Sequence, residues 1–174
     1  ALYNIGLMHL NGNTLDENPE KAAAALLKAA KLGNHDAQFA IAELYHQGKG
    51  VKQDEILATL YYGQAARGGH ETAEIEYAIR LLNGTGIGKN VHDAALWFTR
   101  NAEYGNATAQ HQLARLHLIG LGVPRDPLKA ASWYLIAKKQ GTHDSDLEGF
   151  VETLDLLTKT KAEKKAAQWR PKQR

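Results

Sequence analysis

The sequence predicts an all-α fold, a right-handed α/α solenoid of helix-turn-helix repeats with a C-terminal capping helix. Two observations carry this prediction: residue types recur with a period of 36, and the apolar positions inside each period have helical spacing. The recurring residues are Ala1, Ala37, Ala73 and Ala109; Gly12, Gly48, Gly84 and Gly120; and Gly33, Gly69, Gly105 and Gly141. A fixed period kept in three registers through four copies is the signature of a repeat protein.

The first half of each period is predicted to be a helix. In the second copy the apolar or small residues stand at repeat positions 1, 5, 6, 8 and 9, and they are Ala37, Ile41, Ala42, Leu44 and Tyr45. This spacing places them on one stripe of a helix with 3.6 residues per turn. The glycine at position 12 then ends the helix, because glycine readily takes the left-handed conformation common there.

A loop and a second helix fill the rest of each period. The loop is extended by further glycines at Gly50, Gly86 and Gly122. Short polar side chains follow at Asn18, Asp54, Asn90 and Asp126. Their oxygens can accept a first-turn backbone N–H and so cap the second helix. In the second copy this helix carries Ala58, Tyr61, Tyr62, Ala65 and Ala66. Because each hairpin buries its apolar face only against the next one, stability belongs to the stack.

The unit Ala-x-x-x-Ile-Ala-x-Leu-Tyr-x-x-Gly-x-Gly-Val-x-x-Asp, followed by Ala-x-x-x-Tyr-x-x-Ala-Ala-x-x-Gly, resembles the Sel1-like repeat, a relative of the tetratricopeptide repeat. The resemblance covers residues 1–141 and implies four repeats, over 1–36, 37–72, 73–108 and 109–141. Three departures stand out. The first copy reads Gly12-Asn13-Thr14-Leu15 without a second glycine, and the third has Arg80 at an apolar position and Gly88 at a polar one.

After Gly141 the pattern becomes that of a terminal cap. Asp144, Ser145 or Asp146 can cap a last helix, which is expected within residues 142–168. Residues 169–174 form a basic tail, expected as a solvated end and not as a site for an anionic partner. The stretch ending at Ala166-Ala167-Gln168-Trp169 is similar to the C-terminal helix of alphaproteobacterial Sel1 proteins, among them a periplasmic regulator of exopolysaccharide synthesis.

Composition and charge argue against several functions. The formal charge is +2 with the two signs mostly interspersed, so no nucleic-acid partner is expected. The absence of cysteine removes disulfides, thiolate nucleophiles and cysteine-based metal sites. The longest apolar runs fall far short of the roughly 20 residues that a membrane-spanning helix needs, so no membrane insertion is expected. The start at Ala1 is interpreted as that of a processed or trimmed fragment, and we expect a periplasmic location with the cytoplasm left open.

No metal, cofactor or catalytic residue is predicted. The eight histidines form no local ligand pair, and His9 and His117 stand where Tyr45 does, so packed, hydrogen-bonded histidines are expected there. The glycine-rich stretch 84–89 follows a predicted helix and lacks the spacing of a phosphate-binding loop. Since no constellation of nucleophile, base and acid can be assembled, the chain is not expected to be an enzyme.

A partner-binding groove is predicted on the concave face, which the first helix of each hairpin lines in such solenoids. Repeat positions 3, 7, 10 and 11 lie opposite the packing stripe, and they are mainly apolar with a polar group in nearly every copy. The predicted partner-binding residues are Tyr3, Leu7, Phe39, Glu43, His46, Gln47, Ile75, Ile79, Asn83, His111, Arg115 and Ile119. The alternative is that positions 3 and 10 pack against the preceding hairpin and that 7 and 11 alone meet solvent.

These features predict a protein–protein interaction scaffold that binds a partner segment on its concave face. The narrower resemblance implies a periplasmic inhibitor of a sensor histidine kinase, with the periplasmic domain of that kinase as the partner. Two other hypotheses stay open. One is a binder or weak hydrolase of a cell-wall fragment or β-lactam-like ligand, and the other is a self-associating scaffold, since uncapped repeat ends can stack on each other.

Overall fold

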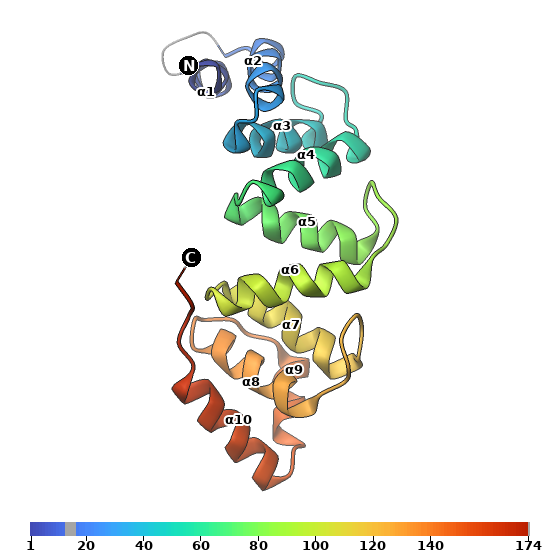
Figure 1. Ribbon diagram of the computed structural model, residues 1–174, viewed down its shortest axis with the longest axis vertical. Coiled ribbons are helices and arrows are strands. Elements are labelled where there is room, and N and C mark those ends of the chain that lie inside the picture. Colours follow the sequence, from blue (N-terminus) through green and yellow to red (C-terminus); the bar gives the residue numbers. More distant parts are fainter. Residues whose placement is uncertain (13–16, 174) are drawn as a thin grey trace. The chain divides into compact units, whose positions relative to one another are not determined.

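The computed structural model describes residues 1–12 and 17–173, and within these ranges every regular element is a helix (Figure 1). The predicted all-α hairpin fold is confirmed. The helices are α1 (Leu2–Asn11), α2 (Pro19–Lys31), α3 (His35–Gln47), α4 (Glu55–Arg67), α5 (Glu71–Asn83), α6 (Val91–Glu103), α7 (Ala107–Ile119), α8 (Pro127–Lys138), α9 (Ser145–Glu152) and α10 (Leu156–Gln168). The departure from the repeat at Asn13, Thr14 and Leu15 lies outside the described residues.

The chain divides into two compact units, Ala1–Lys89 and Asn90–Arg174. The division falls between the two helices of the third repeat, so that α5 belongs to the first unit and α6 to the second. The first unit therefore holds two complete hairpins and one further first helix. The second unit holds α6, the fourth hairpin and the C-terminal helices.

Each second helix begins at the polar residue that the sequence predicts as its cap. Asp54 shows the arrangement most fully, because its Oδ1 accepts the backbone N–H groups of both Ile56 and Leu57 at 2.9 Å. One first-turn N–H is accepted by each of the other three caps, at 2.8 to 3.1 Å, and these caps are Asn18, Asn90 and Asp126. The cap prediction is confirmed in all four repeats, and each such bond stabilises its helix by about 1 kcal/mol.

The first helices have caps of their own, which the sequence reading missed. The N-cap residues of α3, α5 and α7 are Asn34, His70 and Asn106. A buried glutamine follows two of them by four residues: Gln38 donates to the carbonyl of Ala30 at 3.2 Å, and Gln110 to that of Ala102 at 3.1 Å. Each glutamine satisfies a carbonyl near the end of the preceding second helix, so it joins one hairpin to the next.

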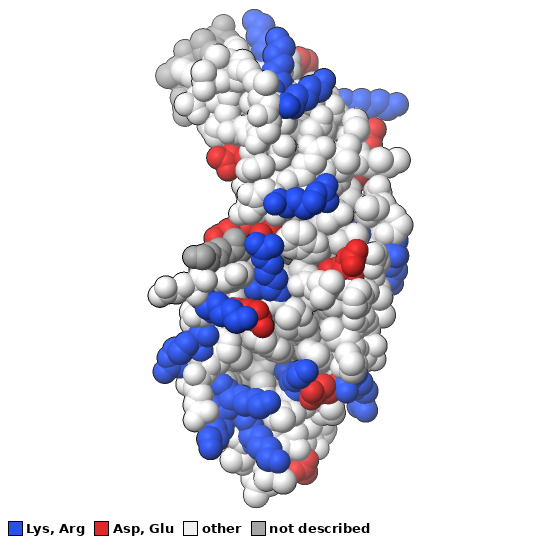
Figure 2. Space-filling view, in the orientation of Figure 1, with Lys and Arg blue, Asp and Glu red and all other residues white. Residues whose placement is uncertain are grey.

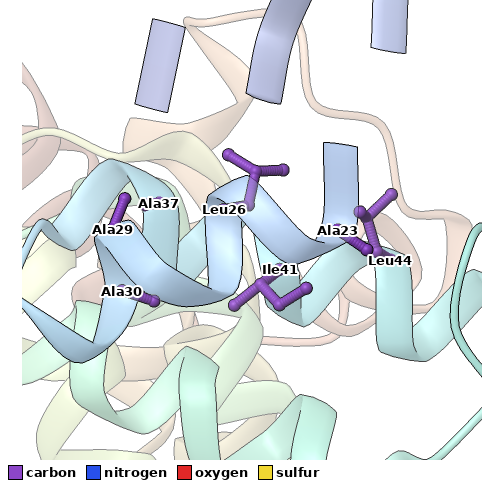
Figure 3. Packing of buried hydrophobic residues seen from close by; sticks show 7 residues of the cluster. All are labelled: Ala23, Leu26, Ala29, Ala30, Ala37, Ile41 and Leu44. Carbon is purple, nitrogen blue, oxygen red and sulfur yellow. The ribbon is translucent and has the colours of Figure 1, made fainter. Parts of the chain in front are cut away.

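The core of the first unit lies where α2 meets α3. Seven buried residues form it, and Figure 3 shows their side chains on the two helices: Ala23, Leu26, Ala29, Ala30, Ala37, Ile41 and Leu44. Tyr45 and Tyr61 stack beside them with ring centroids 5.9 Å apart. Alanine dominates, so the helices approach closely, while each fully buried Leu or Ile contributes about 1.5 to 3 kcal/mol.

The second unit ends in two helices where one capping helix was expected over 142–168. Asp144 caps α9, as the sequence allows, but α9 stops after Glu152. Asp155 then accepts the N–H of Thr158 at 3.0 Å and starts α10. A capping residue inside the apolar pattern therefore divides the segment. Leu147 of α9 and Ala162 of α10 are both fully buried in one core cluster with Tyr134 of α8.

The C-terminal segment has exposed side chains over residues 170–173, as expected of a solvated tail over 169–174, but it also contacts the rest of the unit. Residues 169–173 lie along the second unit, with the Trp169 ring edge-on to Trp133 at 6.3 Å. The backbone N–H of Lys172 donates to the carbonyl of Glu103 at 2.9 Å, at the open C-terminal end of α6. The half-buried Trp169 ring and the hydrogen bond to the Glu103 carbonyl hold this segment against α8 and the end of α6. The lysines remain outside, and Figure 2 shows Lys and Arg side chains gathered over α10.

Loop glycines set how closely consecutive hairpins approach. Gly50 has φ +70°, and a Cβ built on it would meet the carbonyl oxygen of Pro19, the first residue of α2, at 2.1 Å. The same contact recurs one and two periods later, between Gly86 and Glu55 and between Gly122 and Val91, at 2.0 and 2.2 Å. Each pair joins a loop to the first turn of the preceding second helix, so no side chain larger than hydrogen fits.

We expect Gly50→Ala to destabilise the first unit far more than Gly33→Ala. Both glycines have positive φ, and an alanine there costs about 1 to 2 kcal/mol. No atom lies within 4 Å of a Cβ at Gly33, whereas Gly50 meets backbone, which should add about 2 kcal/mol. Free energies of unfolding from urea denaturation measure the difference. Equal losses in the two variants would contradict the packing role of Gly50.

Candidate functional site

The predicted partner-binding residues lie on α1, α3 and α5 of the first unit and on α7 of the second, and we call the faces that they occupy on each unit the first-helix surface. Its repeat positions differ in exposure. Position 11 is exposed at Gln47, Asn83 and Ile119, whereas position 7 is half-buried at Leu7, Glu43 and Ile79 and exposed at Arg115. Position 3 is half-buried at Tyr3, Phe39 and His111. Ile75 corrects the prediction, because it is only 6% exposed and belongs to the core.

Phe39 explains why position 3 contributes mainly to packing. Its ring stacks on His70, the cap of α5, with centroids 4.4 Å apart and planes 16° apart. It also meets Tyr62 edge-on at 5.8 Å. The side chain therefore joins α3 to α4 and to the start of α5. A helical wheel drawn for one helix cannot show these neighbours, because they come from other helices.

Beside Phe39, Glu43 collects hydrogen bonds on the first-helix surface. It accepts the hydroxyl hydrogen of Tyr62 and, at 3.1 Å, one from the amide of Gln47. Burial and the neighbouring Glu43 carboxylate raise the pKa of the Tyr62 hydroxyl, so it stays protonated and remains a donor. Glu43 is thus held in one position, and Gln47 is oriented by it at the exposed edge.

Arg80, the charged residue at an apolar repeat position, is buried against α4. Its guanidinium Nη1 donates to Glu55 Oε2 at 2.7 Å and to Thr59 Oγ1 at 3.1 Å. The guanidinium also lies over the Tyr62 ring, 4.5 Å from the centroid. The hydrogen bond from Arg80 lowers the pKa of Glu55, and His46 Nδ1, 2.8 Å from Glu55 Oε1, contributes in the same direction. This pairing offsets the cost of burying the charge.

We expect Arg80→Met to move the pKa of Glu55 most of the way back to its usual range, because the main hydrogen-bond donor is lost. An NMR titration of the side-chain carboxyl carbons measures this pKa. Arg67→Met, which alters an exposed arginine on α4, is the matched control and should leave Glu55 unchanged. A Glu55 pKa that stays low in Arg80→Met would show that another group stabilises the carboxylate.

In the second unit, Asp144 connects the first-helix surface to α9. Its Oδ2 lies 2.7 Å from His111 Nε2 and accepts a hydrogen bond from Arg115 Nη1 at 2.6 Å. Its Oδ1 accepts the N–H groups of Asp146 and Leu147. Burial opposes ionisation of Asp144, but the bonds from His111 and the Leu147 amide, with the Arg115 charge, outweigh it and lower the pKa to about 2. His111 and Arg115, two of the predicted partner-binding residues, thus contact Asp144, which the sequence indicates only as a helix cap.

We expect Asp144→Asn to cost about 2 kcal/mol at pH 7, because asparagine keeps the cap but loses the charge. The folded pKa lies below the unfolded one, so this stabilisation is present above about pH 4 and disappears as the pH falls toward 2. Urea unfolding at several pH values measures it. Asp126→Asn is the control, since that cap faces the exposed Lys129 at 3.8 Å. Equal effects of the two variants at pH 7 would contradict the ion-pair account.

Within residues 1–12 and 17–173 no group of three or more His, Asp and Glu side chains could hold a metal ion. In the same ranges no helix combines the length and apolar character needed to cross a membrane. His117 is buried with Nδ1 3.1 Å from the carbonyl oxygen of Pro124, which confirms the prediction of a packed, hydrogen-bonded histidine.

Capped helical hairpins with a mixed apolar and polar first-helix surface place this chain in the class of α/α repeat proteins. The family model of the Sel1 repeat matches it four times, at residues 1–34, 35–70, 72–105 and 107–142. The chain therefore belongs to the Sel1 repeat family. Sel1 repeat proteins generally act as non-catalytic scaffolds for contacts between proteins.

Two curated relatives match a short part of the chain. They are the alginate biosynthesis proteins AlgK of Pseudomonas syringae pv. tomato and of Azotobacter vinelandii, 38% and 39% identical over 61 residues. Each match covers 35% of this chain and 13% of the relative, so the chain spans about an eighth of their length.

Solved structures match nearly the whole chain. A Sel1 repeat protein from Oxalobacter formigenes is 26% identical, with a TM-score of 0.79 over 97% of this chain and 72% of that one. A protective antigen of uropathogenic Escherichia coli strains, described as displaying an SLR fold, is also 26% identical. Its TM-score is 0.78 over 96% of this chain and 37% of the antigen.

Proposed function

We propose that this chain is an interaction scaffold whose first-helix surface binds a segment of a partner protein. We further propose that it acts in the bacterial periplasm as an inhibitor of a membrane sensor histidine kinase. The binding proposal rests on family membership and on one observation about the surface. In the first unit an exposed amide occupies repeat position 11 of each first helix, at Asn11, Gln47 and Asn83.

An amide side chain suits the recognition of a peptide backbone because it both donates and accepts hydrogen bonds. A partner segment in extended conformation presents its own N–H and C=O groups, so successive amides can hold it in register. The half-buried residues at position 7, among them Leu7 and Ile79, provide apolar contact beside the amides. Capped helices, the hydrogen bonds to Glu43 and the ion pair of Arg80 with Glu55 keep this surface rigid, which lowers the entropic cost of binding.

The second unit presents a different surface at the corresponding positions. Ile119 is exposed at position 11, and Arg115 is exposed at position 7 beside the Asp144 carboxylate. An apolar side chain next to a fixed ion pair favours a partner with its own apolar residue and a polar neighbour. The periplasmic location and the sensor kinase are supported by the sequence resemblance to a periplasmic regulator of exopolysaccharide synthesis. The partial match to alginate biosynthesis proteins also supports a role connected with exopolysaccharide synthesis.

We expect an Asn83→Ala, Ile119→Glu double variant to lose its partner in affinity capture from bacterial envelope fractions, read by mass spectrometry. Leu96→Glu is the matched control, because Leu96 is an equally exposed apolar residue on a second helix. The wild type and the control should retain one membrane sensor protein. Its purified periplasmic domain should bind them at least tenfold more tightly than the double variant.

Two outcomes would count against parts of this proposal. Equal capture by all three proteins would remove the first-helix surface as the binding site. Selective capture of a protein that is not a membrane sensor would retain the scaffold and remove the kinase-inhibitor role.

A further inference from the structure

A cleft in the first unit lies outside the first-helix surface. It has a volume of about 200 Å³ and is formed by α4, α5 and the loop that follows α5. Its lining includes Ile56, Leu60, Gly63, Arg67, Tyr77 and Ile87. Three are large apolar side chains left in water, since Ile56 is 69% exposed, Leu60 49% and Ile87 41%. Nothing in the proposed function accounts for this apolar opening.

The cleft exists because one helix position departs from the repeat. Gly63 stands inside α4 at the position that Leu27 occupies in α2, 36 residues earlier. At that earlier junction Leu27 and Val51 both pack against the core that contains Ile41. The counterparts of Val51 and Ile41 are Ile87 and Tyr77. Without a side chain at position 63, the Tyr77 ring takes part of the space that Leu27 fills one repeat earlier, and Ile87 remains 41% exposed.

Tyr77 shows why glycine, and not a merely smaller residue, is needed. A Cβ on Gly63 would lie 2.9 Å from Cε2 of the Tyr77 ring, so the ring forms the floor of the cleft where the leucine would stand. Glycine inside a helix costs about 1 kcal/mol relative to alanine. The exchange of a Leu–Ile pair for a Gly–Tyr pair thus lowers helix stability and opens a cleft. The Tyr77 ring fills only part of the space that a leucine would take, and local departures from a repeat that leave an open cleft are expected at functional positions.

The cleft has a positive charge at one end. Arg67, in the last turn of α4, is exposed, and its Cζ lies 5.9 Å from the centroid of the Tyr77 ring. Among the described residues no carboxylate forms an ion pair with Arg67. Charge complementarity therefore favours a partner that combines an apolar anchor with a carboxylate. The volume is below the 300 to 1,000 Å³ typical of small-molecule pockets, which favours one inserted side chain over a whole ligand.

We propose that this cleft is a second docking site, which accepts a protein segment carrying an aliphatic or aromatic anchor and an acidic residue. The anchor contacts Ile56, Leu60 and Ile87, and the carboxylate pairs with Arg67. Leu60 and Arg67 are seven residues apart on α4, about 10 Å along the helix axis. A segment in polyproline II conformation rises about 3.1 Å per residue and presents every third side chain on the same side, so the acidic residue is the third from the anchor. The scaffold then holds two partner segments on separate surfaces.

Random 12-residue peptides displayed on phage, selected on the wild-type chain, test this site. Selected sequences should share an apolar residue with Asp or Glu three positions away, on one side or the other. The most enriched one, made as a fluorescent peptide, should lose at least tenfold in affinity for Leu60→Glu by fluorescence anisotropy. Leu96→Glu is the matched control, because Leu96 occupies the same repeat position 36 residues later and is 56% exposed. It should bind the peptide as the wild type does.

A charge exchange makes the test specific. Selection on Arg67→Glu should replace the acidic residue of the motif by Lys or Arg. Circular dichroism spectra of the variants should match the wild type, since both substituted side chains are exposed. Peptides that bind Leu60→Glu as tightly as the wild type, or whose charge preference does not follow residue 67, would overturn the proposal.

The outcome is independent of the proposed function. The Asn83→Ala, Ile119→Glu variant should bind the selected peptide unchanged, because neither residue lines the cleft. Peptide binding that is lost in that variant, and kept in Leu60→Glu, would assign the peptide to the first-helix surface and overturn the cleft.

Discussion

The contact between a loop glycine and the first turn of the preceding second helix is the constraint on which the stack of hairpins depends. Gly50, Gly86 and Gly122 each bring a loop against a backbone carbonyl so closely that a Cβ would overlap it. This contact sets the distance between consecutive hairpins, and the small side chains of the core match that distance. Alanine is sufficient at Ala23, Ala30 and Ala37 because the loops have already brought the helices together.

Charges are accommodated in this stack by pairing them across helices. Arg80 stands where leucine stands in neighbouring repeats, yet Glu55, Thr59 and the Tyr62 ring surround its guanidinium. Asp144 is surrounded in a similar way by His111, Arg115 and two backbone amides. Such pairs add little net stability when compared with apolar packing, but they orient the residues beside them. Glu43 and Gln47 are held in position by hydrogen bonds alone, from the Tyr62 hydroxyl to Glu43 and from Gln47 to Glu43.

The sequence predicts those features that depend on residues close together in the chain. The caps at Asn18 and Asp54 and the left-handed turn at Gly48 follow from local chemistry, and the structure confirms them. The exposure of the first-helix surface could be predicted only in part, because it depends on which side chains arrive from other helices. Phe39 packs on a histidine cap, and Asp144 reaches His111 across 33 residues. The cleft beside Gly63 was missed because a helical wheel shows which face a residue occupies but not whether the facing position is empty.

The docking of the C-terminal segment changes how the second unit can come apart. In an ideal repeat array each hairpin touches its nearest neighbours, so unfolding can proceed from one end, one repeat at a time. Lys172 instead binds Glu103 across 69 residues of chain, at the end of α6. This contact closes the second unit into a loop that spans the fourth hairpin and both terminal helices. We therefore expect the release of the C-terminal segment to be linked to fraying at the end of α6, through a contact of longer range than those within the helical hairpins.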